Sequence, residues 1–350
     1  MSDLPLWTSR VRVIALPGSA TVRLDRRAAL VCAVLAALLL GLGALALTLG
    51  ETAITVGQVV SALAGGGDDG VRRIVVQWRL PRVVMAVLGG AALGVSGAVF
   101  QSMTRNPLGS PDIIGFSTGA YTGALVASLV LGRSALGTTL GALVGGLGAA
   151  VLVYLLAFRG GLQGFRLVVV GIAVSAVLSA VNSYLLVRAR LEEAVTAATW
   201  GAGSLNGVRW PDVAPVALSL LVLAPACAVL VRRLTVLELG DDHARLLGLG
   251  VERSRAGLLV VGVGLIAVVT AVLGPIAFVA LAAPQVARRL VAGTGPGLAP
   301  AAVVGALLLL GSDVLAQRVV APGQLPVGVV TGCLGGAYLV WLLGRARRRS

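Results

Sequence analysis

The chain contains no lysine, and its 350 residues include only 14 acidic residues and one histidine. Charged residues make up 12% of the sequence, whereas a soluble domain averages about 25%. Hydrophobic residues reach 57%, and the mean hydropathy is +0.98. A chain this apolar has too little polar surface to cover a water-soluble core. We therefore expect an integral membrane protein.

Several other absences argue against metal binding, nucleotide binding and catalysis by this chain. Cys32, Cys227 and Cys333 stand singly in apolar stretches, and no His or Cys cluster has the spacing of metal ligands. The sequence has no phosphate-binding Gly-x-x-x-x-Gly-Lys-Ser/Thr loop, no paired carboxylates and no nucleophile–base set. We therefore expect no catalytic residue, no metal and no cofactor. If transport is driven by ATP, the ATPase is another chain.

Apolar stretches of membrane length recur along the whole sequence. A helix needs about 20 apolar residues to cross the hydrocarbon core. Ten spans are predicted, at roughly 28–49, 83–102, 113–131, 136–158, 167–187, 213–231, 256–273, 276–292, 300–317 and 326–343. The prediction is an all-α polytopic protein with one transmembrane domain, 28–344, between tails at 1–27 and 345–350.

The arginines predict the orientation. The formal net charge of +14 does not indicate nucleic-acid binding, because the arginines lie mainly in short loops between the spans. If the N-terminus is cytoplasmic, 19 of the 28 arginines fall on the cytoplasmic side. Cytoplasmic loops of membrane proteins carry such an excess. Both termini are therefore predicted to be cytoplasmic.

Arginines on the outer side need a reason. Arg79 and Arg82 flank Pro81, about one helical turn apart, at the outer end of the second span. They could dock an acidic partner or an anionic cargo, or they could reach the lipid phosphates. The residues alone leave both readings open.

Asp313 is the main carboxylate inside a predicted span. Such a residue is a functional candidate by default. It lies close to the outer face, so we expect it to pair with Arg318 or to cap a helix. A proton-driven carrier would need a carboxylate nearer the middle of the membrane.

Two segments on the inner side have distinctive patterns. Pro107 and Pro111 interrupt any helix between the second and third spans, and Asp112 is placed to cap the third. This turn is either a plain connection or a rigid element beside a gate or an ATPase contact. The loop at 232–255 predicts a short helix that begins at Gly240-Asp241 and ends at Gly248 or Gly250. Its predicted apolar face either binds a partner or packs back on the bundle; its members are Ala244, Leu246, Leu247 and Leu249.

Five blocks of the sequence together carry a family resemblance. They are Arg79–Ala120, LGDDHARLLGLGV at 239–251, GPIAFVALAAPQVARRLVAG at 274–293, and the later LLLLGSDVLAQR and LPVGVVTGCLGGAYLVWLL. In this order they resemble the FecCD-type permeases of bacterial ATP-binding cassette importers for iron-siderophores and vitamin B12. The loop ATWGAGSLNGVRW is most similar to the subunits that serve ferric catecholate siderophores such as enterobactin.

The resemblance implies a vitamin B12 permease-like bundle of ten helices in the bacterial cytoplasmic membrane. It implies a second permease subunit, more often a paralogue than an identical copy. It also implies two ATPase subunits and an extracytoplasmic binding protein that docks on outer arginines. Arg79 and Arg82 match two family arginines. The third family arginine falls at Gln317, beside Arg318, and a family glutamate falls at Gln324.

The resemblance also assigns the inner segments. The loop at 232–255 matches the helix that couples the permease to the ATPases, with the candidate residues Gly240, Asp241, Asp242, Ala244, Leu247 and Gly248. Asn106, Pro107 and Pro111 form a candidate structural turn near the gate. The alternatives are a vitamin B12 or haem permease of the same family and an ion-driven secondary carrier.

Overall fold

The computed structural model describes residues 11–15, 21–50, 52–112, 115–132, 135–158, 164–292, 295, 297–320 and 323–347. Residues 1–10, 16–20 and 348–350 of the two predicted tails lie outside this part. The elements in chain order are β1 (Val11–Ala15), β2 (Thr21–Asp25), α1 (Arg26–Thr48), α2 (Val56–Leu63), α3 (Asp69–Arg73), η2 (Ile74–Arg79), α4 (Leu80–Thr104), α5 (Phe116–Leu125), η3 (Val126–Val130), α6 (Ala135–Ala157), α7 (Gly164–Arg188), α8 (Leu191–Gly201), α9 (Trp210–Glu238), α10 (Asp241–Leu246), α11 (Val251–Leu273), α12 (Val279–Val291), α13 (Leu298–Val319) and α14 (Val327–Arg347).

The ten predicted spans each contain a helical segment. Seven helices among the described residues are long and apolar enough to cross a membrane, and the apolar segments Phe116–Val130 and Val327–Tyr338 are shorter. The eighth predicted span, 276–292, contains a helix of only 13 residues, because Phe278 has a φ of 68° and α12 begins after it. The all-α polytopic fold is therefore confirmed.

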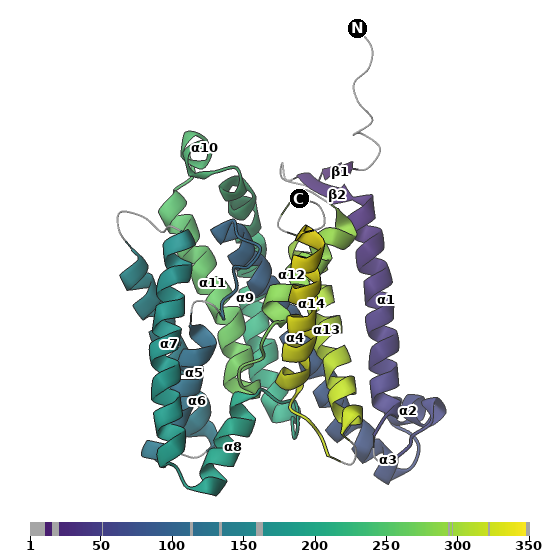
Figure 1. Cartoon of the computed structure of the whole chain (residues 1–350). Coiled ribbons are helices and arrows are strands. Elements are labelled where there is room, and N and C mark those ends of the chain that lie inside the picture. Colours follow the sequence, from purple (N-terminus) through teal and green to yellow (C-terminus); the bar gives the residue numbers. More distant parts are fainter. Residues whose placement is uncertain are drawn as a thin grey trace.

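The elements outside the spans gather at the two ends of the bundle (Figure 1). One end carries α10, the hairpin of β1 and β2, and the last turns of α14. The other end carries α2, α3 and α8. The hairpin pairs Val11 with Asp25 and Ala15 with Thr21, and it was not predicted. Since α10 belongs to the loop predicted to be cytoplasmic, we call its end the inner end and the opposite end the outer end.

Helix α4 is the centre of the bundle and packs against α9, α11, α12 and α13. Its contact with α13 is made by backbone. A Cβ atom on Gly90 would lie 2.4 Å from the carbonyl oxygen of Gly305, and one on Gly94 would lie 2.1 Å from that of Ala301. Small residues let membrane helices approach this closely. Only glycine fits at these two positions.

The helix of α4 extends further outward than predicted. Asp69–Thr104 forms one continuous helical segment of 36 residues, so part of the predicted outer loop is helix. Pro81 lacks an N–H group, and the turn before it, η2, widens to a π-helix. The carbonyl of Val76 instead accepts a hydrogen bond of 2.9 Å from the indole Nε1 of Trp210 at the start of α9. This contact brings the start of α9 to the outer end of α4.

Two glycines of α6 give a matched test of the packing. A Cβ atom on Gly145 would lie 2.3 Å from the carbonyl oxygen of Gly119 in α5, whereas one on Gly148 would meet nothing within 4 Å. We expect Gly145→Ala to lower stability by about 1–3 kcal/mol through overpacking. Gly148→Ala is expected to be neutral or slightly stabilising, because alanine favours helices. Thermal unfolding of both variants in detergent measures the difference, and equal unfolding temperatures would contradict the packing argument.

Candidate functional site

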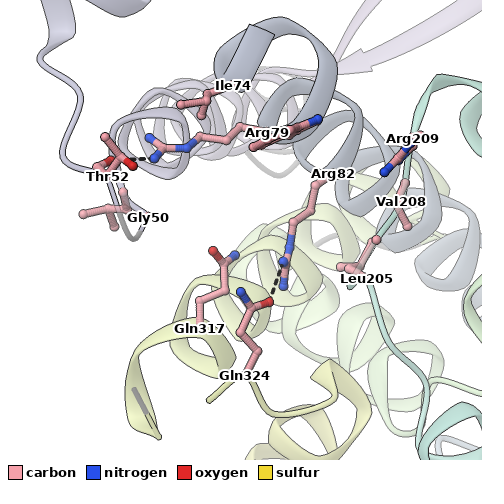
Figure 2. Close-up of a pocket in the computed structure, with 13 residues that line it drawn as sticks. Gly50, Thr52, Ile74, Arg79, Arg82, Leu205, Val208, Arg209, Gln317 and Gln324 are labelled. Carbon is pink, nitrogen blue, oxygen red and sulfur yellow. Dashed lines mark hydrogen bonds between the residues drawn. The ribbon is translucent and has the colours of Figure 1, made fainter. Parts of the chain in front are cut away.

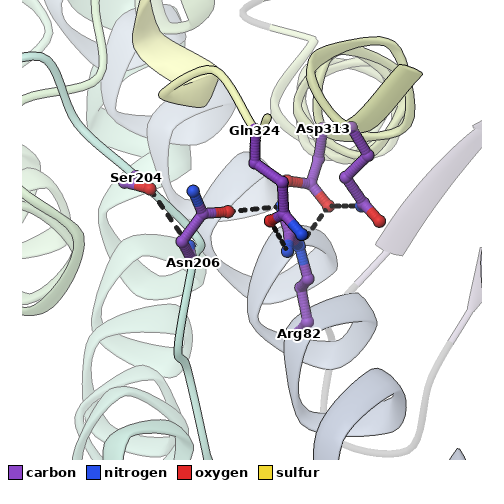
Figure 3. Close-up of polar contacts among 6 residues, drawn as sticks. Arg82, Ser204, Asn206, Asp313 and Gln324 are labelled. Carbon is purple, nitrogen blue, oxygen red and sulfur yellow. Dashed lines mark hydrogen bonds and ion pairs between the residues drawn. The ribbon is translucent and has the colours of Figure 1, made fainter. Parts of the chain in front are cut away.

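At the outer end, Arg82 forms a polar network that joins four segments (Figure 3). Its Nε and Nη2 donate to the two carboxylate oxygens of Asp313 in α13, at 2.9 and 2.8 Å. Nη1 donates to the side-chain oxygen of Gln324 at 3.0 Å, and Nη2 also donates to that of Asn206 at 2.8 Å. The Asp313 side chain is 2% exposed and that of Arg82 is 15% exposed. The guanidinium therefore ties α4, α13 and two outer loops together.

The predicted pairing of Asp313 with Arg318 is wrong. Asp313 pairs with Arg82, which is 231 positions away in the chain, and accepts a further hydrogen bond of 2.8 Å from the Nε2 of Gln317. Gln317 lies one turn after Asp313 and shares its face of α13. Arg318 is turned away from that face and is exposed. Its charge repels that of Arg79.

Arg79 is also held within the subunit. Its Nη1 donates to the carbonyl of Leu47 in the last turn of α1 at 2.8 Å, and its Nη2 donates to the carbonyl of Thr52 at 2.6 Å. The last carbonyls of a helix have no partner within the helix, so a cation at this position stabilises its end. Arg79 therefore caps α1 and holds the following loop beside α4.

These arginines line a cavity of about 370 Å³ at the outer end (Figure 2). Arg79 and Arg82 contribute from one side, Gln317 and Gln324 from a second, and Arg209 from a third. None of the described residues that line it carries a carboxylate. Arg318 is not among the residues that line it. Arg209 was not predicted as a site residue, and its place directly before the Trp-Pro start of a span was the available signal.

At the inner end, α10 is the predicted short helix. Gly240 precedes it, and Gly248 follows it with a φ of 78°. The N–H of Gly248 donates to the carbonyl of Arg245 at 2.9 Å, and that of Leu249 donates to Ala244 at 2.9 Å. This pair of bonds is a Schellman motif, which favours glycine at the left-handed position. The predicted boundaries of this helix are confirmed.

Asp241 connects α10 to the bundle. Its Oδ1 accepts hydrogen bonds from Arg105 Nη2 at 2.7 Å and from Arg255 Nη2 at 2.8 Å. Arg105 directly follows α4 and Arg255 lies in α11, so one carboxylate joins three elements. The neighbouring Asp242 is 92% exposed and makes only a 3.4 Å contact with Arg245.

The apolar residues predicted for one face of α10 do not share one environment. Ala244 is fully buried, because it packs toward the bundle, whereas Leu246 and Leu247 are 86% and 66% exposed. Leu249 is half-buried and accompanies Ala244 at the end of the helix. The exposed apolar surface therefore consists of two leucines.

The turn after α4 is held by hydrogen bonds to its own backbone and to α12. The side-chain oxygen of Asn106 accepts a hydrogen bond of 2.9 Å from the N–H of Leu108. The carbonyl of Pro107 accepts one of 2.8 Å from the Nε2 of Gln285 in α12. Pro111 is buried. The turn therefore joins α4 to α12.

Asp112 does not supply the predicted N-cap of the third span. The cap position of α5 is Gly115, and the Asp112 carboxylate instead accepts a hydrogen bond from the hydroxyl of Ser117. Burial raises the pKa of Asp112 to about 6, while the bond from Ser117 acts in the opposite direction. The Asp112 carboxylate therefore contacts the first turn of α5 through the side chain of Ser117.

Comparisons with known proteins find two similar transport permeases. The ferric enterobactin transport system permease protein FepG of Escherichia coli K12 is 48% identical over 329 residues, which cover 94% of this chain and 100% of that protein. The achromobactin transport system permease protein CbrC of Dickeya dadantii 3937 is 38% identical over 83% of this chain and 84% of that one.

A solved structure gives the same architecture. It is described as an inward-facing conformation of a metal-chelate type ABC transporter, and it aligns with a TM-score of 0.81 and 26% identity over 91% of this chain and 99% of that one. The model of the FecCD transport family matches residues 38–345. With that match across nearly all of the membrane bundle, this chain is a member of the FecCD transport family.

Proposed function

We propose that this chain is a permease subunit of an ATP-binding cassette importer, with a ferric catecholate siderophore as its cargo. The observation that supports this cargo is the 48% identity to the ferric enterobactin permease over that protein's full length. The subunit performs no bond chemistry. It offers a path for an iron chelate between its outer and inner ends.

The outer cavity suits one kind of partner protein, and the exposed leucines of α10 suit another. A cavity lined by arginines, with no carboxylate among its described lining residues, suits an acidic binding protein that delivers the chelate. The exposed Leu246 and Leu247 suit an apolar groove on a separate ATPase subunit. We place the outer end of the bundle outside the cell and the α10 end in the cytoplasm. A second permease, a paralogue of this chain, completes the transporter.

The contacts of Asp241 can transmit motion of the ATPase subunits to the membrane helices. When ATP closes the two ATPase subunits, α10 moves with them. Because Asp241 holds Arg105 and Arg255, that motion reaches α4 and α11 directly. Alternating access then follows from the displacement of these helices relative to the partner permease.

Uptake of a labelled iron chelate tests the proposal. A deletion strain lacking its own siderophore permeases receives this chain with its partner permease, ATPase and binding protein. We expect accumulation of 55Fe-enterobactin at least about 10-fold above the strain without this chain, and no accumulation with a hydrolysis-defective ATPase.

Other outcomes of the uptake assay would change the assignment. Accumulation of haem or cobalamin in place of the catecholate would contradict the proposed cargo and leave the permease role. Uptake that persists with the inactive ATPase and follows an ion gradient would contradict the ATP-driven role and favour a secondary carrier.

A further inference from the structure

The three arginines that line the outer cavity are in different bonding states. Arg82 uses Nε, Nη1 and Nη2 in hydrogen bonds to side chains of its own subunit. Arg79 uses both Nη atoms on backbone carbonyls. Among the residues that the structure describes, none accepts a hydrogen bond from the side chain of Arg209 or forms an ion pair with it. Arg209 is thus the cavity arginine whose donors are available.

Arg209 is also held firmly in place. Its backbone N–H donates a hydrogen bond of 2.8 Å to the carboxylate of Asp212 in the first turn of α9. The next residue, Trp210, anchors to the carbonyl of Val76 in the outer extension of α4. The preceding Val208 is buried and also lines the cavity. The backbone of Arg209 is therefore fixed beside α4, while its side chain is exposed at the cavity (Figure 2).

The cost of binding a new carboxylate differs between these arginines. A carboxylate that recruited Arg82 would have to take it from Asp313, which is 2% exposed and would remain as a buried charge. Leaving one partner of a buried ion pair uncompensated is strongly unfavourable. A carboxylate that binds Arg209 displaces only water, and it gains a charge-assisted, two-pronged hydrogen bond.

We propose that Arg209 is the residue that pairs directly with an acidic side chain of the extracytoplasmic binding protein, and that Arg79 and Arg82 are positioning residues. Arg79 and Arg82 hold the walls of the cavity and add positive potential to it. This inference rests on the proposed function, and it assigns the contact to an arginine outside the pair flanking Pro81. Charge reversal of Arg79 and Arg82 would consequently disturb the fold as well as docking.

Binding of the cognate binding protein to the complete transporter in nanodiscs tests the inference. We expect Arg209→Glu to raise the Kd of the binding protein about 10-fold or more, and Arg209→Gln to raise it less. Since charge pairs at the edge of an interface are screened by salt, both variants should also show a weaker dependence of Kd on salt concentration. The matched control is Arg73→Glu, because Arg73 is an exposed arginine at the same end that does not line the cavity.

The outcomes separate this inference from the proposed function. If Arg209→Glu and Arg73→Glu change the Kd equally while wild type binds normally, the role of Arg209 is overturned. If the wild-type transporter binds no binding protein, the proposed function itself fails. An unchanged unfolding temperature of Arg209→Gln shows that its effect on binding does not come from misfolding.

Discussion

Replacement of Asp313 by alanine is expected to destabilise the protein by about 3–5 kcal/mol and to abolish uptake, because it leaves the largely buried charge of Arg82 without its carboxylate. Asp313 accepts three hydrogen bonds, two from Arg82 and one from Gln317. Gln324 and Asn206 still accept from Arg82 in the variant, but amide oxygens do not neutralise a cation. The measurement is the unfolding temperature of the purified complex together with uptake of the iron chelate.

A surface pair provides the control for Asp313. Asp69 is 97% exposed and lies 4.0 Å from Arg72, so Asp69→Ala is expected to leave the unfolding temperature unchanged. The double variant Arg82→Met, Asp313→Leu removes both charges together, and apolar replacement of a buried pair is often neutral. We therefore expect it to regain most of the lost stability. If Asp313→Ala unfolds at the temperature of Asp69→Ala, the pair does not hold the outer end together.

Replacement of Asp241 by alanine is expected to reduce uptake about 10-fold while the protein still inserts in the membrane and the ATPase still hydrolyses ATP. The reason is that Asp241 is the shared acceptor of Arg105 and Arg255, so its loss separates α10 from α4 and α11. A tenfold change corresponds to about 1.4 kcal/mol, within the range found for residues that transmit coupling. Transport per ATP hydrolysed, measured in proteoliposomes, reports this loss.

The neighbouring carboxylate is the matched control for Asp241. Asp242 lies on the same turn of α10 but is exposed and makes only a long contact with Arg245. Asp242→Ala should therefore transport like wild type. Equal transport per ATP in the Asp241→Ala and Asp242→Ala variants would show that the ionic contacts of α10 do not carry the coupling.

The fold was predicted well where one physical signal dominates. Apolar runs locate the ten helical segments because the cost of exposing backbone and charge to lipid is large. The predicted helix boundaries were less accurate where local hydrogen bonding or backbone geometry overrides the apolar pattern. The helix of α4 extends outward past Pro81 because a π-turn and the indole of Trp210 satisfy the backbone that proline interrupts. The shortening of α12 depends on the unusual backbone of Phe278, which no composition rule reveals.

The site was predicted in part, because a sequence shows neighbours along a helix and not across a bundle. The pattern around Asp241 and Gly248 predicted α10 correctly, since caps act within one turn. The cationic partner of Asp313 was sought at Arg318, five residues away, and is Arg82, 231 residues away. The sequence left open whether Ala244 faces a partner or the bundle, because only the packing of α10 decides which side faces the bundle.

The backbone contact between α4 and α13 restricts which helices can move during transport. Packed helices slide past one another by changing the rotamers of the side chains between them. At Gly90 and Gly94 there are no such side chains, and the carbonyls of α13 sit directly against the backbone. This joint has no alternative rotamers, so α4 and α13 are expected to travel as one rigid body. The part of the outer cavity that Arg82 of α4 and Gln317 of α13 supply would then move as one piece when α4 is displaced relative to the partner permease.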